Sequence, residues 1–428
     1  MILHREALSI LEETARLHLM KDEAVALEQS MGRILSRQVL SPEDVPSFAN
    51  SAMDGFAVFS SDTSEASPDH PVTLPVNGIV GAGDAAGLAH AQAVGQGQAI
   101  EIMTGAPVPG GGHDSVVRIE DVTVTRTATG VAQAIVLHRP SPRGANIRLS
   151  GTDFHVGQVV LNPGDRVGAS HVLACASLGI ATLTVKAKPR VAVLSTGSEL
   201  VSPREVTLAP GMIRNSTGPY LHAALRQLGA DSHYLGIVAD EPARYRKMLE
   251  QAIQDGADVI VSTGAVSMGK YDFVSDVLKQ MNAKIHFHKA SIRPGKPILF
   301  AEVEFAGRWC AIFGVPGNPV STAVAQRFFI EPYLRAAQSL AREEPLRIPL
   351  KAECTKPEGL RCFYKGSARI SDHHLEAAVL KGQASYVVSE LLDASCWVVL
   401  PEEGRVLPQG SLIDVYPLNN AFERGVLS

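Results

Sequence analysis

Few cysteines, few aromatic residues and no long apolar run limit what this chain can be. Its 428 residues include five cysteines, none in CxxC spacing, so neither a zinc ribbon nor a disulfide framework is expected. Aromatic residues make up only 5%, which leaves little for base-stacking platforms. No apolar run approaches the roughly 18 residues of a membrane span, and the N-terminus lacks the apolar core of a signal peptide. We therefore expect a cytoplasmic protein.

An excess of positive charge is also missing. The formal net charge is −5, which argues against a nucleic-acid-binding protein with a global basic field. The length predicts about three domains at roughly 150 residues each. Hydrophobic residues make up 45% of the chain, enough for each domain to bury a core.

The first 188 residues combine helices with short strands. Apolar residues at helical spacing predict a helix from residue 4 and a second helix over residues 28–40. Between residues 47 and 143, β-branched runs alternate with Gly, Pro and Asp turns, which predicts an all-β module. Residues 144–188 add a Gly-rich turn region, one short helix and a strand.

Strands and helices alternate regularly over residues 190–340. This pattern predicts a doubly wound, mainly parallel α/β sheet, in which ligands bind at the carboxyl ends of the strands. Residues 345–417 return to short strands and predict a small β-barrel or sandwich.

Gly- and Ser/Thr-rich loops follow three predicted strands of the α/β region. They lie at residues 195–200, 262–272 and 314–321. Such loops offer backbone N–H groups and helix N-termini to an anion. One such loop is usually an ordinary turn, but three at the ends of one sheet favour a shared phosphate or oxyanion site. Residues 264–270 have P-loop spacing without the Ser or Thr that should follow the lysine, so an ordinary P-loop NTPase is not expected.

Charged residues accompany these loops. Arg293 and Lys296 flank a proline-held turn, where a guanidinium and an ammonium are preorganised to bind an oxyanion. Carboxylates occur at predicted loop ends and suit Mg²⁺ shared with substrate phosphates; they are Asp54, Glu199, Asp240 and Asp272. Asp272 is equally suited to cap a helix, and Asp54 to form a turn.

The motifs occur in an order that resembles one known family. They are SAMDGFAV (51–58), MTGAPVP (103–109), STGSEL (195–200), STGAVSMGKYDFV (262–274), RPGKP (293–297) and GVPGNPVS (314–321). Together they resemble the molybdenum insertases, which include bacterial MoeA and the gephyrin E domain. The resemblance extends over essentially the whole chain.

This resemblance implies a four-domain architecture and a reaction. The domains would be an elongated domain from residues 1–46 and 144–188, an inserted β domain (47–143), an α/β molybdopterin-binding-like domain (189–340) and a C-terminal β-barrel (341–428). The family members are homodimers that insert molybdate into adenylylated molybdopterin with Mg²⁺, releasing AMP and molybdenum cofactor. The adenylylating partner domain and cofactor-free molybdoenzymes would be further partners.

The resemblance also implies residue roles. Catalytic roles would belong to Asp54, Asp153, Glu199, Asp240, Asp272 and Lys296, with Asp54, Glu199, Asp240 and Asp272 holding the metal. Substrate-binding roles would belong to Thr104, Thr196, Gly197, Ser262, Thr263, Gly264, Ser267, Gly269, Lys289, Arg293, Pro316, Gly317, Asn318, Pro319, Ser321, Arg361 and Ser389.

Several positions depart from the family pattern. Ser216-Thr217 stands where a Ser-Asn pair is usual, and the arginine of the C-terminal domain is displaced to Arg361. Ser389-Glu390 replaces a Ser-Ser pair, and an acid there would repel an oxyanion. A non-catalytic relative acting as a binding or scaffold protein is therefore the alternative. A nucleotide-dependent transferase acting on another anion is a third hypothesis.

Overall fold

The chain forms two compact units, which are described separately. The computed structural model describes residues 1–265, 273–371 and 374–418. Unit 1 comprises Met1–Ala24, Gly32–Ser36 and Thr184–Ser428, and unit 2 comprises Val25–Met31 and Arg37–Leu183. Two of the four boundaries between the units fall within strands β1 (Asp22–Ala26) and β12 (Thr182–Lys186). Among the described residues, no helix combines the length and apolarity needed to cross a membrane.

Unit 2 contains a six-stranded sheet with the strand order β7-β4-β6-β5-β9-β8. The strands are β4 (Gly55–Val58), β5 (Val72–Val80), β6 (Ala99–Ile102), β7 (Ser115–Arg118), β8 (Val122–Arg126) and β9 (Ala132–Leu137), with 3₁₀ turns at Ser60–Thr63 and Ile119–Asp121. The all-β prediction is wrong in one respect, because helix α2 (Ala85–Ala91) follows β5. Asp84 starts this helix by accepting the Gly87 N–H at 2.8 Å.

Short strand pairs join the chain segment that precedes this sheet in the sequence to the segment that follows it. They are β2 (Val39–Leu40) with β11 (Val159–Leu161), and β3 (Asn50–Ser51) with β10 (Ile147–Arg148). Helix α3 (Ala169–Ser177) follows β11, and a 3₁₀ turn forms at Leu27–Gln29.

The helix predicted over residues 28–40 is absent. Gly32 adopts a positive φ of 76°, which ends any helical run. Leu35 instead pairs as a β-bridge with Val185, and both side chains are buried. A tertiary β-contact therefore overrides the helical spacing of the apolar residues.

Unit 1 is built on a mixed six-stranded sheet with the order β16-β13-β17-β21-β20-β18. The strands are β13 (Arg190–Thr196), β16 (Asp231–Val238), β17 (Val259–Thr263), β18 (Lys284–Phe287), β20 (Leu299–Phe305) and β21 (Arg308–Val315). Strands β16, β13, β17 and β21 are parallel, whereas β20 is antiparallel to both β21 and β18. The α/β prediction of a mainly parallel sheet is confirmed.

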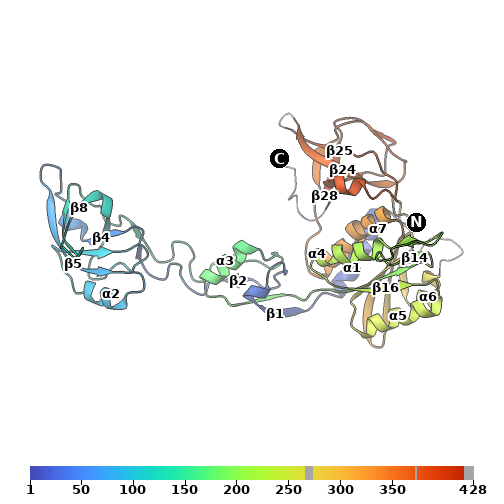
Figure 1. The fold of residues 1–428 in the computed structure, drawn as a ribbon, viewed down its shortest axis with the longest axis horizontal. Helices are drawn as coiled ribbons and strands as arrows, with labels where there is room; N and C mark the ends of the chain where they lie inside the picture. Colours follow the sequence, from blue (N-terminus) through green and yellow to red (C-terminus); the bar gives the residue numbers. More distant parts are fainter. Residues whose placement is uncertain (266–272, 372–373, 419–428) are drawn as a thin grey trace. The chain divides into compact units, whose positions relative to one another are not determined.

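Helices cover both faces of this sheet. On β13, Val191 and Val193 face the core shared with α4 (Thr217–Gln227) and α7 (Pro319–Ala325), while Ala192 and Leu194 face α5 (Pro242–Gln254) and α6 (Val274–Gln280). Figure 1 shows α4 and α5 on opposite sides of β16. Burial on both faces explains why the strand sequences are almost continuously apolar.

The remaining helices of unit 1 extend the core on the α4 side. Helix α1 (His4–Leu17) buries Ala7, Leu11 and Ala15 there. Helix α7 continues through one π-helical turn (Gln326–Ile330) into α8 (Glu331–Ala337). The short pair β14 (Leu200–Val201) and β15 (Ile213–Arg214) extends from the loop after β13.

The C-terminal part of unit 1 is a second mixed sheet, with the order β19-β24-β26-β28-β22. Its strands are β19 (Ile292–Arg293), β22 (Leu346–Pro349), β24 (Arg361–Ser371), β25 (His374–Val379), β26 (Cys396–Leu400) and β28 (Leu412–Pro417). Strand β25 pairs with β24, and a bridge between Leu350 and Ala377 turns the sheet back on itself. Beside it lie β23 (Cys354–Thr355), β27 (Val406–Leu407) and α9 (Glu390–Asp393).

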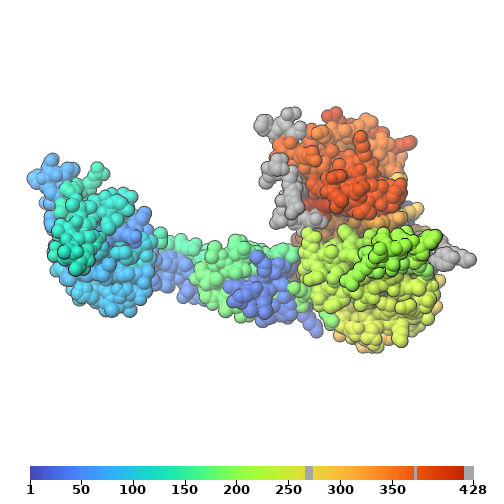
Figure 2. All heavy atoms as spheres, viewed as in Figure 1, coloured from blue at the N-terminus to red at the C-terminus, as the bar shows by residue number. Residues whose placement is uncertain are grey.

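This second sheet packs directly on the α/β part of unit 1. Strand β19 belongs to the α/β sequence but pairs with β24, matching Ile292 to Arg361. Phe363 and Trp397 enter the same buried cluster as Phe328. In the space-filling view, residues of the second sheet, orange to red, lie against the α/β body (Figure 2).

Candidate functional site

The carboxyl ends of four parallel strands meet at one edge of the α/β sheet. Strand β13 ends at Thr196, β16 at Val238, β17 at Thr263 and β21 at Val315. All three Gly-rich loops predicted from the sequence begin here, so the sheet places them side by side, as expected for ligand sites of this architecture.

Close contacts join these loops into one continuous surface. The Thr196 hydroxyl donates to the Thr263 carbonyl oxygen at 3.0 Å, and the Gly264 N–H donates to the Val315 carbonyl oxygen at 3.0 Å. A Cβ on Gly264 would lie 2.4 Å from the Thr196 carbonyl oxygen, and one on Gly317 would lie 3.8 Å from Gly264 Cα. Glycine at position 264 therefore lets the loop after β17 approach β13, whereas a Cβ on Gly317 would make only an ordinary contact.

The loop after β13 carries Glu199 and is hydrogen-bonded to Asp240 in the loop after β16. Both the N–H and the hydroxyl of Ser198 lie 3.2 Å from Asp240 Oδ2 and donate to it. The Glu199 carboxylate folds over Gly197, where an added Cβ would lie 2.6 and 2.8 Å from its oxygens. Gly197 also has a φ of +147°, which favours glycine, so both its backbone conformation and the space beside it call for a residue without a side chain.

Of the four predicted metal ligands, the structure places Glu199 on this turn and Asp240 in the loop after β16, which Ser198 joins to the turn. Asp54 belongs to unit 2, and Asp272 lies outside the described residues, as do the predicted substrate contacts Ser267 and Gly269. Within residues 1–265, 273–371 and 374–418, no group of three His, Cys, Asp or Glu side chains is arranged to hold a metal. Two hard carboxylates do fit Mg²⁺, which keeps most of its water shell and shares phosphate oxygens.

The cationic turn lies against the first turn of α7. Arg293 ends β19, and both Arg293 and Lys296 are exposed. A Cβ on Gly295 would lie 3.5 Å from the Ser321 carbonyl oxygen, so the turn touches the helix start directly. Positive side chains thus lie beside the N-terminal end of a helix, where an anion is also stabilised by the helix dipole. The Lys289 carbonyl oxygen accepts the Ile2 N–H at 3.0 Å, upstream of this turn.

Several predicted contact residues have buried side chains. Thr196, Ser262, Thr263 and Ser321 are each less than 5% exposed, and Pro316 is also buried. Gly317 and Asn318 are exposed and Pro319 is half-buried, so this turn presents its backbone to solvent. Contacts from Thr196 and Thr263 to a ligand would therefore come mainly from the backbone, because their hydroxyls bond within the protein.

A segment of the second sheet also reaches the start of α7. The Val320 N–H donates to the Ser385 carbonyl oxygen at 3.0 Å. Lys365 on β24 is fully buried beneath the segment and donates its Nζ to the Val387 carbonyl oxygen at 2.7 Å. Gln383 binds both backbone groups of Lys365, at 2.9 and 2.8 Å. We call residues 383–389 the capping segment.

Lys365 is a candidate functional residue that the sequence analysis missed. Burial lowers the pKa of its ammonium group, while the nearby Glu390 carboxylate opposes that shift. The available signal was a single lysine inside the apolar strand run Cys362–Ala368. Buried lysines are rare unless a partner or a function retains them.

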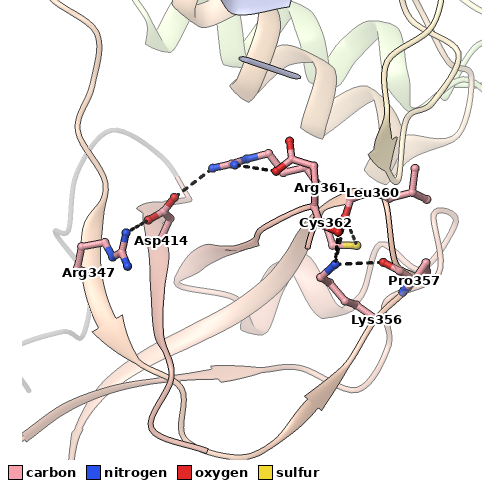
Figure 3. Close-up of polar contacts among 8 residues, drawn as sticks. Arg347, Lys356, Pro357, Leu360, Arg361, Cys362 and Asp414 are labelled. Carbon is pink, nitrogen blue, oxygen red and sulfur yellow. Dashed lines mark hydrogen bonds and ion pairs between the residues drawn. The ribbon is translucent and has the colours of Figure 1, made fainter. Parts of the chain in front are cut away.

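Arg361, a predicted substrate contact, forms ion pairs with two carboxylates. Its guanidinium lies 3.4 Å from a Glu402 carboxylate oxygen and 3.1 Å from Asp414. Figure 3 shows the guanidinium directed at Asp414, which also meets Arg347 at 3.3 Å. Two carboxylates therefore already neutralise this cation.

Ser389 lies at the end of the capping segment, next to Glu390 at the start of α9.

Unit 2 carries three more predicted site residues. Asp54 Oδ1 accepts both the N–H and the hydroxyl of Thr104, at 2.7 and 2.8 Å. These bonds lower the pKa of the Asp54 carboxyl, the backbone bond contributing most. The two predicted residues are thus brought together on the surface of unit 2. Asp153 lies on another turn, where its N–H donates to the Val45 carbonyl oxygen at 2.9 Å.

Family models match three regions that together span most of the chain. Residues 2–179 match the MoeA N-terminal region (domain I and II), residues 192–336 a probable molybdopterin binding domain, and residues 347–418 the MoeA C-terminal region (domain IV).

Individual relatives match over nearly their full length. The molybdopterin molybdenumtransferase of Synechococcus elongatus is 38% identical over 410 residues, which is 96% of this chain and 97% of the relative. The Bacillus subtilis protein of the same name is 33% identical over 92% of this chain and 89% of its own. A solved molybdopterin biosynthesis MoeA structure from Pyrococcus horikoshii is 28% identical, covers 98% of this chain and 99% of its own, and superposes with a TM-score of 0.79.

Proposed function

Because this chain belongs to the MoeA family of molybdopterin molybdenumtransferases, we propose that it inserts molybdate into adenylylated molybdopterin and releases AMP and molybdenum cofactor. The observation that carries the proposal is the continuous edge of unit 1. Two carboxylates lie at one end of it, and Arg293, Lys296 and the start of α7 lie at the other. This arrangement suits a long substrate with a phosphoanhydride and a separate oxyanion.

The loops of β13, β17 and β21 would bind the pterin, phosphate and adenylate groups. Glycines let the chains approach, so a ligand would reach those N–H groups of the loops that do not already donate within the protein without side-chain rearrangement. The same role is proposed for Gly197, Ser262, Gly264, Pro316, Asn318, Pro319 and Ser321, which belong to these loops or to the first turn of α7. Preformed donors of this kind stabilise developing negative charge with little reorganisation.

Arg293 and Lys296 would hold molybdate next to the dithiolene. A guanidinium binds two oxyanion oxygens at once, and an ammonium adds a compact charge. The buried ammonium of Lys365 beneath the capping segment supports the same end of the site. Lys289, just upstream of the turn, and Ser389, at the end of the capping segment, are proposed as further contacts.

Glu199 and Asp240 would hold Mg²⁺, together with Asp272. When bound, the ion neutralises the charge of the phosphoanhydride. Asp240 also keeps Ser198 in place through two hydrogen bonds, and Gly197 leaves room for the Glu199 carboxylate. We propose catalytic roles for Asp54 and Asp153 of unit 2 and a substrate-binding role for Thr104.

We further propose that the protein acts as a homodimer in the cytoplasm. The adenylylating partner domain would supply its substrate, and cofactor-free molybdoenzymes would take its product. A non-catalytic binding or scaffold role is the second candidate. It is favoured by Glu390 at the capping segment and by the pairing of Arg361 with Glu402 and Asp414.

The test is reconstitution from purified components. The chain is mixed with adenylylated molybdopterin, Mg²⁺ and molybdate, and AMP release is measured beside activation of a cofactor-free molybdoenzyme. Both products should depend on molybdate. Binding of the pterin without either product would exclude the enzymatic proposal and favour the binding role.

A matched pair of lysine variants sharpens this test. Lys296→Ala should raise the molybdate concentration for half-maximal rate about tenfold, the scale of one lost charge-assisted contact. Lys247→Ala removes the same charge from the exposed face of α5 and should leave that concentration unchanged. Equal responses of the two variants would exclude a specific role for Lys296.

A further inference from the structure

A buried hydrogen-bond network lies beneath the loops of β13 and β17, and it starts from Asn215. This residue follows β15 directly and is 1% exposed. Its Nδ2 donates to the Tyr234 hydroxyl on β16 at 2.6 Å. Its Oδ1 accepts the Gly218 N–H in the first turn of α4 at 3.2 Å and the Thr217 hydroxyl at 3.3 Å. One amide thus connects a strand, a helix start and the chain after β15.

The network continues to the ends of both motif strands. The hydroxyls of Thr217 and Thr263 lie 3.2 Å apart. Because the Thr217 hydroxyl donates to Asn215 Oδ1, it accepts the hydrogen of Thr263. The Thr263 carbonyl oxygen in turn accepts the Thr196 hydroxyl at 3.0 Å. Asn215 therefore sets the direction of the hydroxyl bonds as far as Thr263 at the end of β17, and the Thr263 carbonyl oxygen links that residue to the end of β13.

The side chains of this network are closely packed and shielded from water. A Cβ on Gly218 would lie 2.6 Å from the Tyr234 ring and 2.7 Å from Ser195 Oγ. Thr196 and Thr263 are 3% and 1% exposed, so water cannot readily replace a lost partner. The Thr196 carbonyl oxygen lies directly against Gly264, where an added Cβ would come within 2.4 Å of it.

We propose that Asn215 is a positioning residue of the candidate site, which holds the loops at residues 196–200 and 263–265 in the arrangement that binds adenylylated molybdopterin. This role rests on the proposed function. Nothing in the sequence motifs assigned it, because Asn215 lies outside every Gly-rich loop. Asn215 does not contact the substrate itself; it acts through Thr217 and Thr263.

The reach of the network predicts which substrate is affected. Its hydrogen bonds connect β16, α4, β17 and β13, and among the described residues none runs to the turn at 293–297 or to the capping segment. Loss of Asn215 should therefore weaken binding of the pterin nucleotide without changing the molybdate requirement.

Three variants test this role. Asn215→Ala should raise KM for adenylylated molybdopterin about tenfold, a scale set by the loss of buried hydrogen-bond partners, and leave KM for molybdate unchanged. Asn215→Asp should restore the wild-type KM, because a carboxylate still accepts from Thr217 and Gly218 while the Tyr234 hydroxyl turns to donate. Thr63→Val is the control, since Thr63 is equally buried and hydrogen-bonded but lies in unit 2. It should leave both KM values unchanged.

A second measurement is independent of turnover. Amide hydrogen exchange of the peptide covering residues 259–265 should be several-fold faster in Asn215→Ala than in wild type or Asn215→Asp. Unchanged exchange there, or a KM for molybdate that rises in parallel, would overturn the positioning role. A wild-type protein without turnover would refute the proposed function instead, and the exchange measurement would still decide the role of Asn215.

Discussion

Acid should destabilise this protein through His4, the first residue of α1. The imidazole is 6% exposed and lies edge-on against Phe329 and Phe363, with ring centroids 5.1 Å away in both cases. Its Nε2 lies 3.2 Å from the Phe328 carbonyl oxygen. Burial, with a smaller contribution from Arg361, lowers the pKa of His4 from 6.5 to about 3. The ring is therefore neutral in the folded protein across the physiological range.

The size of the effect follows from the two pKa values. In the unfolded chain His4 titrates near 6.5, so between pH 6.5 and about 3 the unfolded state binds more protons than the folded state. The free energy of unfolding therefore falls as the pH drops through this window. At about 1.4 kcal/mol per pH unit, pH 5 costs roughly 2 kcal/mol. This is a large share of the roughly 5–15 kcal/mol that stabilises a typical domain.

In the assay the full chain is unfolded with urea at pH 7 and at pH 5, and tryptophan fluorescence monitors the unfolding of unit 1. Both tryptophans, Trp309 and Trp397, belong to this unit. His4→Phe retains a ring against Phe329 and Phe363 but cannot be protonated. The wild type should lose about 2 kcal/mol more than this variant between the two pH values.

Two further observations complete this test. His374→Phe, at an exposed position of the second sheet, controls for the loss of one histidine. It should follow the wild-type pH dependence. Parallel curves for wild type and His4→Phe would refute the reasoning, because they would show that His4 does not stay neutral when buried.

Three other changes have defined outcomes. Gly264→Ala should lower the melting temperature by several degrees and raise KM for the pterin substrate, because its Cβ would meet the Thr196 carbonyl oxygen at 2.4 Å in a backbone with φ of +87°. Calorimetry and steady-state kinetics measure these two effects, and an unchanged melting temperature would exclude the close contact. Gly197→Ala should displace the Glu199 carboxylate and raise the Mg²⁺ concentration for half-maximal rate at least several-fold, measured by Mg²⁺ titration. An unchanged Mg²⁺ concentration would show that Glu199 is not a metal ligand. Thr104→Val should raise the pKa of Asp54 toward its usual range, since the carboxylate loses one of the two hydrogen bonds that it accepts from Thr104. A ¹³C NMR titration of the Asp54 carboxyl carbon measures this pKa, and an unchanged value would show that the hydroxyl bond does not lower it.

The α/β part of the fold was predictable because its signals are local. Strands and helices alternate over residues 190–340 as the pattern predicted, with β13 at Arg190–Thr196, α4 at Thr217–Gln227 and α5 at Pro242–Gln254. Parallel strands that are buried on both faces have unmistakably apolar sequences. The carboxyl ends of such strands share one edge, so the meeting of the three Gly-rich loops could also be expected.

The errors arose where distant residues compete with local patterns. Residues 28–40 have apolar residues at helical spacing, yet Leu35 pairs with Val185, about 150 residues away in the chain. Helix α2 was missed because seven residues, two of them glycine or histidine, carry little periodic signal. The capping by Asp84 is visible only once the turn before the helix is known.

The sequence by itself determined the alternation of strands and helices, the order of the motif loops and the family resemblance, all of which depend on residues close together in the chain. Only the tertiary structure decided which charged groups are paired and which are buried. Arg361 is neutralised by Glu402 and Asp414, which lie 41 and 53 residues further on, whereas Lys365 is buried beneath the capping segment. Asn215 likewise acquires its role only when folding brings Tyr234 and Thr263 together around it. Burial and pairing between distant segments set the electrostatics of a site, and neither follows from local spacing.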